Sequence, residues 1–92
     1  MARKIDFERF LIIECTAQEL MHAVGTCVVI CDWCDQPMNP AAKGYYIAVL
    51  NQWFCEGCFR KWQQRATWFA EDAALERRHF DFYAPRLGIK SQ

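Results

Sequence analysis

The sequence contains none of the common catalytic signatures, such as the GxSxG turn of serine hydrolases, the HExxH helix of zinc proteases or a phosphate-binding loop. We therefore expect the protein not to be an enzyme. No apolar run approaches the roughly 20 residues of a membrane-spanning helix, and charged side chains interrupt the N-terminal stretch where a secretory signal would be continuously apolar. These absences predict a cytoplasmic protein without membrane partners, in a compartment where thiols bind metals more often than they form disulfides.

The sequence also lacks an excess of charge of either sign, because 11 lysine and arginine residues balance 11 aspartate and glutamate residues. A nucleic-acid-binding domain normally has a basic surplus, so the composition argues against that class. Hydrophobic residues make up 53% of the chain, which excludes a disordered or low-complexity protein. The 92 residues predict a single domain over 1–92, which is small enough for a structural metal to contribute strongly to its stability.

Cysteine, by contrast, is present in a specific pattern. Cys31 and Cys34 form one CxxC pair, and Cys55 and Cys58 form a second. Each CxxC turn brings two sulfur atoms to one side of the backbone, so two such turns can supply the four corners of a tetrahedron. The spacing predicts one zinc ion per chain, bound by these four cysteines. Four cysteine ligands leave no open coordination position, so we expect the zinc to be structural.

The residues around the two pairs predict a knuckle and β-hairpin over 31–58. Turn-forming residues occupy 37–44, a β-rich run follows over 45–50, and a second short strand ends at Cys55. No glycine or proline follows Cys58 until Pro85, which predicts a long helix over 59–83 and a tail over 84–92. The predicted fold is therefore α+β: a small zinc-binding, treble-clef-like domain with the second CxxC pair at the N-terminus of its long helix.

The segments 31–38 and 53–61 resemble the second half of a LIM module and, more loosely, a GATA-type zinc finger. The resemblance covers about a third of the chain and implies that the four cysteines are zinc ligands. Asp35 stands where zinc knuckles often have glycine, and aspartate adopts left-handed backbone more readily than most residues. A LIM module has a companion finger, whereas this sequence supplies one complete ligand set. The resemblance implies a role in binding other proteins.

Two other uses of the CxxC pairs stay open. A rubredoxin-type iron site has the same four ligands, and the colour of the purified protein distinguishes red ferric iron from colourless zinc. The second pair also resembles a dithiol redox motif at a helix N-terminus, although that interpretation leaves the first pair unexplained. Of the remaining residues, we expect Cys15 and Cys27 to pack as small apolar side chains, and His22 and His79 to form no second metal site.

Residues 1–30 predict a brace of strand and helix for the zinc core. Thr16 and Glu19 have the spacing of a capping box and Gly25 is a typical stop, so we predict a helix over 17–24. The β-branched run over 26–30 predicts a strand that leads into the first knuckle. The apolar residues 10–13 fit either a strand or a helix face, because periodicity does not separate the two in so short a run.

Two apolar stripes lie on opposite sides of the predicted long helix. The stripe expected to pack against the hairpin contains Phe59, Trp62, Ala66, Phe69, Ala73 and Phe80. The second stripe contains Trp68, Leu75, His79 and Phe82. Either the N-terminal segment covers this second stripe, or another protein does, including a second copy of this chain.

Together these features predict a structural zinc-binding module that mediates protein–protein interaction or self-association through the second stripe. The alternative is a nucleic-acid-binding zinc finger, in which basic residues would follow the phosphates: Lys43, Arg60, Lys61, Arg65, Arg77 and Arg78. Four zinc-bound thiolates and one divalent cation would leave the otherwise neutral chain slightly acidic, which favours the first function.

Overall fold

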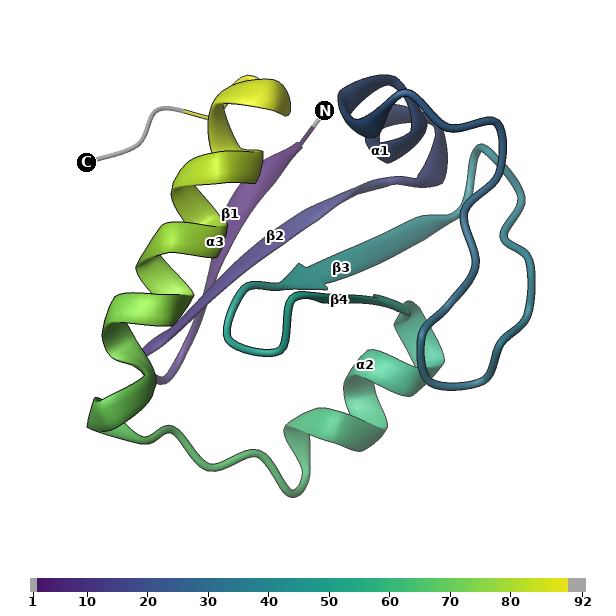
Figure 1. The fold of residues 1–92 in the computed structure, drawn as a ribbon. Coiled ribbons are helices and arrows are strands. Elements are labelled where there is room, and N and C mark those ends of the chain that lie inside the picture. The colour runs from purple at the N-terminus through teal and green to yellow at the C-terminus, as the bar shows by residue number, and fades with distance from the viewer. Residues whose placement is uncertain (1, 90–92) are drawn as a thin grey trace.

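The computed structural model describes residues 2–89 and has an α+β fold built on an antiparallel sheet (Figure 1). The strand order is β1-β2-β3-β4, so every neighbouring pair in space is also consecutive in sequence. The strands are β1 (Arg3–Phe7), β2 (Phe10–Thr16), β3 (Lys43–Ile47) and β4 (Gln52–Cys55). The predicted α+β class is confirmed, and the ambiguous residues 10–13 belong to a strand.

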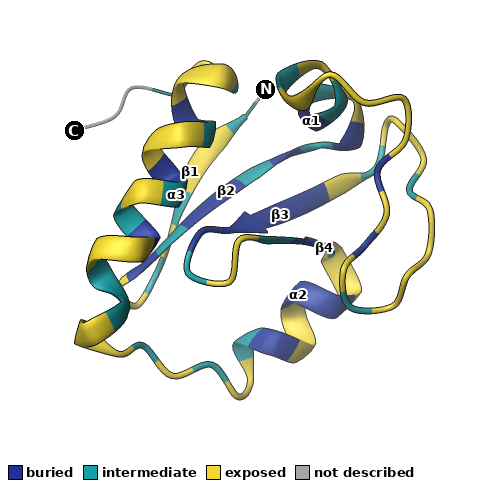
Figure 2. Cartoon of the chain, in the orientation of Figure 1, coloured by how far each residue is buried: buried dark blue, intermediate teal, exposed yellow. Residues whose placement is uncertain are grey.

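Helices cover both faces of the sheet. One face is packed by α1 (Ala17–Val24) and α3 (Ala73–Arg86), and the other by α2 (Glu56–Gln63), with a short 3₁₀ turn, η1 (Ala70–Asp72), before α3. Because side chains alternate along a strand, β2 contributes Ile13 and Cys15 to the first face and Phe10 and Ile12 to the second. Figure 2 shows the result: β2 and β3 are largely buried, and the helices are exposed on their outer sides.

The helix α1 has the predicted bounds. Thr16 accepts a hydrogen bond from the backbone N–H of Glu19, whose carboxylate accepts one from the Thr16 backbone N–H, so both halves of the capping box form. Gly25 ends the helix with a φ of 73°, a left-handed conformation that glycine adopts at little cost. These signals lie within nine residues of each other in the chain, which explains why the sequence sufficed to place this helix.

The prediction of a strand over 26–30 is wrong. This segment makes an isolated bridge between Ile30 and Pro37 and does not join the sheet. Val28 and Ile30 remain 52% and 47% exposed, so their β-branched side chains gain little burial. Residues 3–7 instead form the fourth strand of the sheet, within the segment predicted as a brace.

The prediction of a single long helix over 59–83 is also wrong. Helix α2 ends at Gln63 and α3 begins at Ala73, and the chain between them crosses from one face of the sheet to the other. Phe59 and Trp62 are therefore buried against one face, and Phe80 against the opposite face. A continuous helix could cover only one face, so breaking the helix buries more apolar surface.

The tail predicted to begin at residue 84 also starts too early, because α3 continues through Pro85 to Arg86. Ala84 is completely buried, and the ring of Tyr83 lies 4.3 Å from that of Tyr46. This packing holds the last turn in place despite the proline, as tertiary contacts often override local propensity. Leu87 and Ile89 pack against the same core, and residues 90–92 of the predicted tail lie outside the described range.

Candidate metal centre

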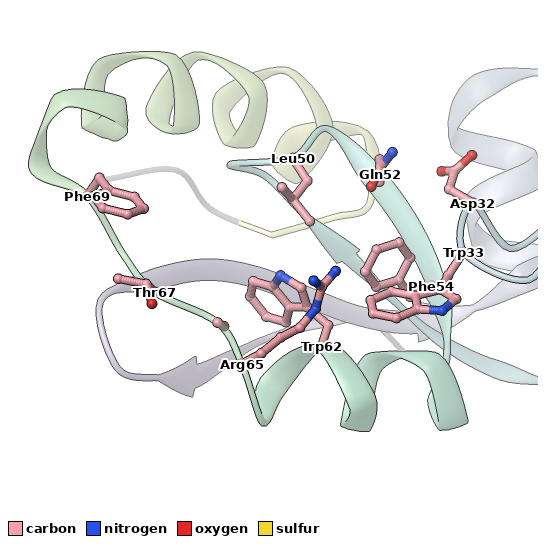
Figure 3. Close-up of a pocket in the computed structure, with 10 residues that line it drawn as sticks. Asp32, Trp33, Leu50, Gln52, Phe54, Trp62, Arg65, Thr67 and Phe69 are labelled. Atoms are coloured by element: carbon pink, nitrogen blue, oxygen red, sulfur yellow. The ribbon is translucent and has the colours of Figure 1, made fainter.

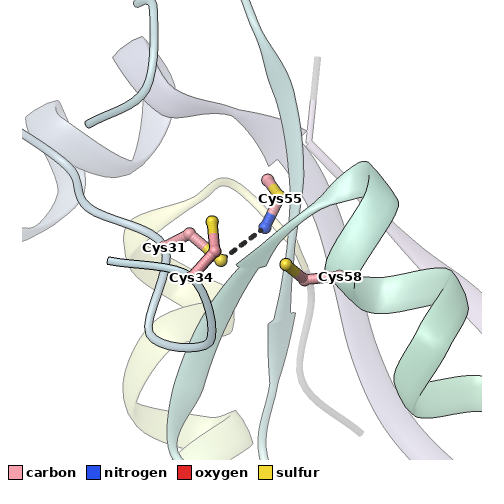
Figure 4. Close-up of side chains that lie close together, drawn as sticks. All are labelled: Cys31, Cys34, Cys55 and Cys58. Carbon is pink, nitrogen blue, oxygen red and sulfur yellow. Dashed lines mark hydrogen bonds between the residues drawn. The ribbon is translucent and has the colours of Figure 1, made fainter. Parts of the chain in front are cut away.

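The four cysteines of the two CxxC pairs come together at one site (Figure 4). Their Sγ atoms all lie within 4.8 Å of one another, which makes them a group that could hold a metal ion. Cys31 and Cys58 are buried, whereas Cys34 is exposed to solvent and Cys55 is partly so. The site therefore sits at the surface, with two sulfur atoms anchored in the core. The predicted convergence of these residues is confirmed.

The first CxxC pair lies in a tight turn. The backbone N–H of Cys31 donates to Gln36 O at 3.0 Å, and the N–H of Asp35 donates to Cys31 O at 2.9 Å. Asp35 has a φ of 59°, the left-handed conformation expected where zinc knuckles often carry glycine. The turn thus aims the sulfur atoms of Cys31 and Cys34 toward one side.

Asp32 joins this turn to the strand that leads to the second pair. Its backbone N–H donates to Trp53 O, and its carboxylate accepts the Trp53 N–H, both at 2.8 Å. These two bonds occupy the outer edge of β4 beside Cys55. Sequence reasoning did not identify this role, because an aspartate inside a CxxC motif carries no signal for a partner far along the chain.

The second pair spans the junction between β4 and α2. Cys55 is the residue preceding the first turn of α2, and Cys58 lies within that turn. The unpaired backbone N–H groups of a helix N-terminus favour negative charge nearby. The second pair lies at a helix N-terminus, as the sequence predicted, and this end of the helix is a suitable place for thiolates.

Backbone donors also surround the sulfur of Cys31. Its Sγ accepts N–H groups from Trp33 at 3.4 Å and from Cys55 at 3.3 Å. Burial by itself would raise the pKa of Cys31, but the N–H groups of Cys34, Cys55 and Trp33 outweigh it and lower the pKa to about 7. In contrast, burial and the neighbouring sulfur atoms raise the pKa of Cys58 to about 12. Cys31 is therefore the more acidic of these two thiols, whereas Cys58 would become a thiolate only if a bound cation compensated its charge.

An aromatic groove of about 530 Å³ lies beside this centre (Figure 3). The Trp33 ring meets Phe54 edge-on, with centroids 5.4 Å apart, and the Arg65 guanidinium lies 4.8 Å from the centroid of the Trp33 ring. The lining residues are Asp32, Trp33, Leu50, Gln52, Phe54, Trp62, Arg65, Ala66, Thr67 and Phe69. Because Trp33 stands between two of the clustered cysteines, the groove depends on the knuckle for its shape.

The two cysteines outside the cluster, Cys15 and Cys27, differ in their burial. Cys15 is buried, and burial raises its pKa to about 12, as expected for a cysteine that packs as a small apolar side chain. Cys27 is exposed, so the same expectation is wrong there. It lies in the segment 26–30, from which Val29 packs into the core while Cys27 stays at the surface.

The two histidines, His22 and His79, are not part of the four-cysteine group. His22 is exposed on α1. A ring nitrogen of His79 lies 2.7 Å from Ala48 O, which ties α3 to the end of β3.

The residues of the predicted contact surface fall into two groups. Leu75 and Phe82 are 45% and 49% exposed. Trp68 and His79 are half-buried and already engaged: the Trp68 indole N–H donates to Glu76 at 3.1 Å, and His79 contacts Ala48. Of the four, Leu75 and Phe82 thus have the most surface available to another molecule.

Comparison with protein-family models, with curated proteins and with solved structures finds no match to this chain. Among residues 2–89, no helix combines the length and apolar character that crossing a membrane would require. The interpretation of the site therefore rests on its geometry and on the chemistry of four clustered thiols.

Proposed function

We propose that this protein is a small interaction module whose fold depends on one zinc ion held by Cys31, Cys34, Cys55 and Cys58. The observation that supports this proposal is the convergence of four sulfur atoms within 4.8 Å from two separate segments. Four thiolates suit zinc, and a Cys₄ site is typical of zinc that stabilises a fold. The order of knuckle, hairpin and helix supports the resemblance to a treble-clef or LIM-type finger, and the closed ligand set argues for a non-enzymatic role.

Bound zinc would act as a cross-link between the two knuckles. The residues 26–42 contribute no strand to the sheet, and Cys31 and Cys34 would hold this segment against the start of α2. Cys58 would fix the same end of α2 on the sheet. A domain of this size gains much of its folding free energy from such a link.

We propose that the aromatic groove beside the metal centre binds a partner protein. Phe54 and Trp62 line the groove but are themselves buried, whereas Trp33 is half-buried and 52% of the Phe69 surface is exposed. Arg65 is held over Trp33 at the same groove, where its guanidinium can pair with a carboxylate. The matching ligand is a peptide segment with a large apolar side chain next to an acidic residue.

A second contact surface is proposed on α3, at the predicted residues Leu75 and Phe82. These two residues are seven positions apart on one helix and so lie on the same side of it. Trp68 and His79 would support this surface from beneath through their contacts with Glu76 and Ala48. The surface suits another protein or a second copy of the chain.

Native mass spectrometry of the purified protein tests the metal part of the proposal. One zinc per chain is expected, and a red protein that contains iron instead would refute it.

A capture experiment tests the interaction part of the proposal. Proteins captured by the wild-type chain are compared with those captured by Trp33→Ala and by the control Lys61→Ala on the exposed side of α2. Loss of a specific protein with the first variant alone supports the groove. Salt-sensitive binding of single-stranded oligonucleotides by the wild type, weakened by Lys61→Ala but not by Trp33→Ala, would instead favour the nucleic-acid-binding alternative.

A further inference from the structure

The strand β1 forms one outer edge of the sheet. It pairs with β2 alone, in the register Phe7 to Phe10, Ile5 to Ile12 and Arg3 to Glu14. At the other edge, Asp32 and Cys31 occupy the outward N–H groups of β4. Within residues 2–89 no comparable segment covers β1. An uncovered edge strand is a template for pairing with another strand.

The hydrogen bonds of β2 show which groups of β1 point outward. The N–H of Leu11 donates to the Glu76 carboxylate at 2.9 Å, and its carbonyl accepts from Ala48 N at 3.2 Å, so both backbone groups of Leu11 face away from β1. Leu11 is paired with Asp6. In an antiparallel ladder the two members of a pair either both bond to each other or both face away. The N–H and C=O groups of Asp6, and by the two-residue repeat those of Lys4, therefore face the open edge.

The side chains at this edge have opposite charges and large exposure. The Lys4 ammonium lies 3.5 Å from the Asp6 carboxylate within the chain, and their side chains are 41% and 99% exposed. If two β1 strands pair antiparallel with Ile5 opposite Ile5, each Lys4 stands opposite Asp6 of the other copy. A shift of the pairing by two residues in either direction would place Lys4 opposite Lys4 or Asp6 opposite Asp6. Charge therefore selects one register.

The same register matches the residues on the opposite face of β1. Ile5 would meet its own copy in a pair without backbone hydrogen bonds, where side chains approach most closely. Arg3, whose side chain is 68% exposed and pairs with Glu14 at 2.8 Å, would lie opposite Phe7. Helix α3 packs on β2 and α2 on β3 and β4, and α2 reaches β1 through Trp62, whose ring centroid lies 5.8 Å from that of Phe7.

We propose that two copies of this chain associate through their β1 strands in this antiparallel register, with Lys4 of each copy opposite Asp6 of the other and one sheet running through both. The interface is self-complementary, as a two-fold dimer requires. This interface uses a surface distinct from the groove and from the exposed side of α3. It depends on the proposed function only because the domain must be folded.

The test measures dimer dissociation by sedimentation equilibrium for the wild type, Lys4→Glu, Asp6→Lys and the double variant that exchanges the two charges. Each single variant places like charges opposite each other twice per dimer, and should weaken association by about tenfold or more. The double variant restores opposite charges and should return the dissociation constant to within about threefold of wild type. Lys61→Glu, a charge reversal on α2, serves as the control and should have no effect.

Zinc content and circular dichroism are recorded for every variant, so that loss of the metal or of the fold is distinguished from loss of pairing. Asp6→Pro provides an independent probe, because it removes an outward N–H group without breaking the β1–β2 ladder. It should abolish the dimer while the zinc content stays unchanged. A wild-type monomer at high micromolar concentration, or a double variant as weak as the single variants, would overturn the proposal.

Discussion

The indole N–H of Trp68 donates a 3.1 Å hydrogen bond to the carboxylate of Glu76, which is 2% exposed. The other oxygen of the same carboxylate accepts the backbone N–H of Leu11 at 2.9 Å. One buried acid thus connects the segment between α2 and α3, the helix α3 and the strand β2. This contact helps to hold the chain in the course that takes it from one face of the sheet to the other.

Replacing Glu76 by alanine should lower the free energy of unfolding by about 1–3 kcal/mol, because it leaves two half-buried donors without their acceptor. Glu76→Gln keeps one carbonyl oxygen and should lose less. Urea unfolding of the purified protein measures both changes. Glu71→Gln, on an exposed residue of η1, is the matched control and should change the free energy by no more than about 0.5 kcal/mol. Equal effects at the two positions would contradict the role assigned to Glu76.

Serine substitution of Cys31, Cys34, Cys55 or Cys58 should abolish zinc binding and unfold the domain under native conditions. The reason is that the binding free energy of a structural zinc ion, about 10 kcal/mol or more in isolated fingers, is largely folding free energy. A strong chelator should have the same effect on the wild type. Thermal unfolding and zinc content are the two measurements. Cys27→Ser, at an exposed thiol outside the cluster, should leave both unchanged; equal damage there would mean that the ligand set is wrong.

Tyr45 should make the protein less stable in strong alkali. Burial, together with the hydrogen bond that its hydroxyl donates to Glu14 at 2.9 Å, raises its pKa to about 12. The unfolded chain releases this proton near pH 10, so the stabilisation is complete below about pH 10 and is lost as the pH rises toward 12.

The expected loss is roughly 1–3 kcal/mol over that window. It is measured by urea unfolding at several pH values, with tyrosinate absorbance reporting the ionisation. Burial raises the pKa of Tyr46 as well, so Tyr45→Phe should reduce the pH dependence without removing it. Ionisation of all three tyrosines near pH 10 in the folded protein would disprove this assignment.

Two glycines should respond in opposite ways to alanine. A Cβ at Gly44 would overlap the Trp53 ring, lying 2.7 Å from its Cε2 atom, and the ring is held by a hydrogen bond to Met38. Gly44→Ala should therefore cost about 2–4 kcal/mol through a displaced tryptophan. At Gly57, in the first turn of α2, a Cβ meets no atom within 4 Å. Gly57→Ala should be neutral or stabilise the domain by up to about 1 kcal/mol. Thermal unfolding compares the pair, and a tolerated Gly44→Ala would show that the Trp53 ring is free to move.

Local signals account for the parts of the fold that could be predicted. The capping box of Thr16 and Glu19, the stop at Gly25 and the hairpin that delivers Cys55 each depend on residues a few positions apart. The break between α2 and α3 has no such signal. The apolar periodicity continues through residues 64–72 with neither glycine nor proline, so the pattern favours one helix. The break forms because the sheet has a second apolar face, which exists only once β1 and β2 have joined β3.

The sequence by itself determined that four cysteines converge, because each CxxC turn and each flanking element is specified by neighbouring residues. It also determined the α+β class and the helix α1. The tertiary structure decided which faces of the helices are covered, where Asp32 and Glu76 make their long-range hydrogen bonds, and that β1 forms an open edge of the sheet. These features depend on contacts between residues that lie far apart in the chain, and no local pattern records which of the possible contacts buries the most apolar surface.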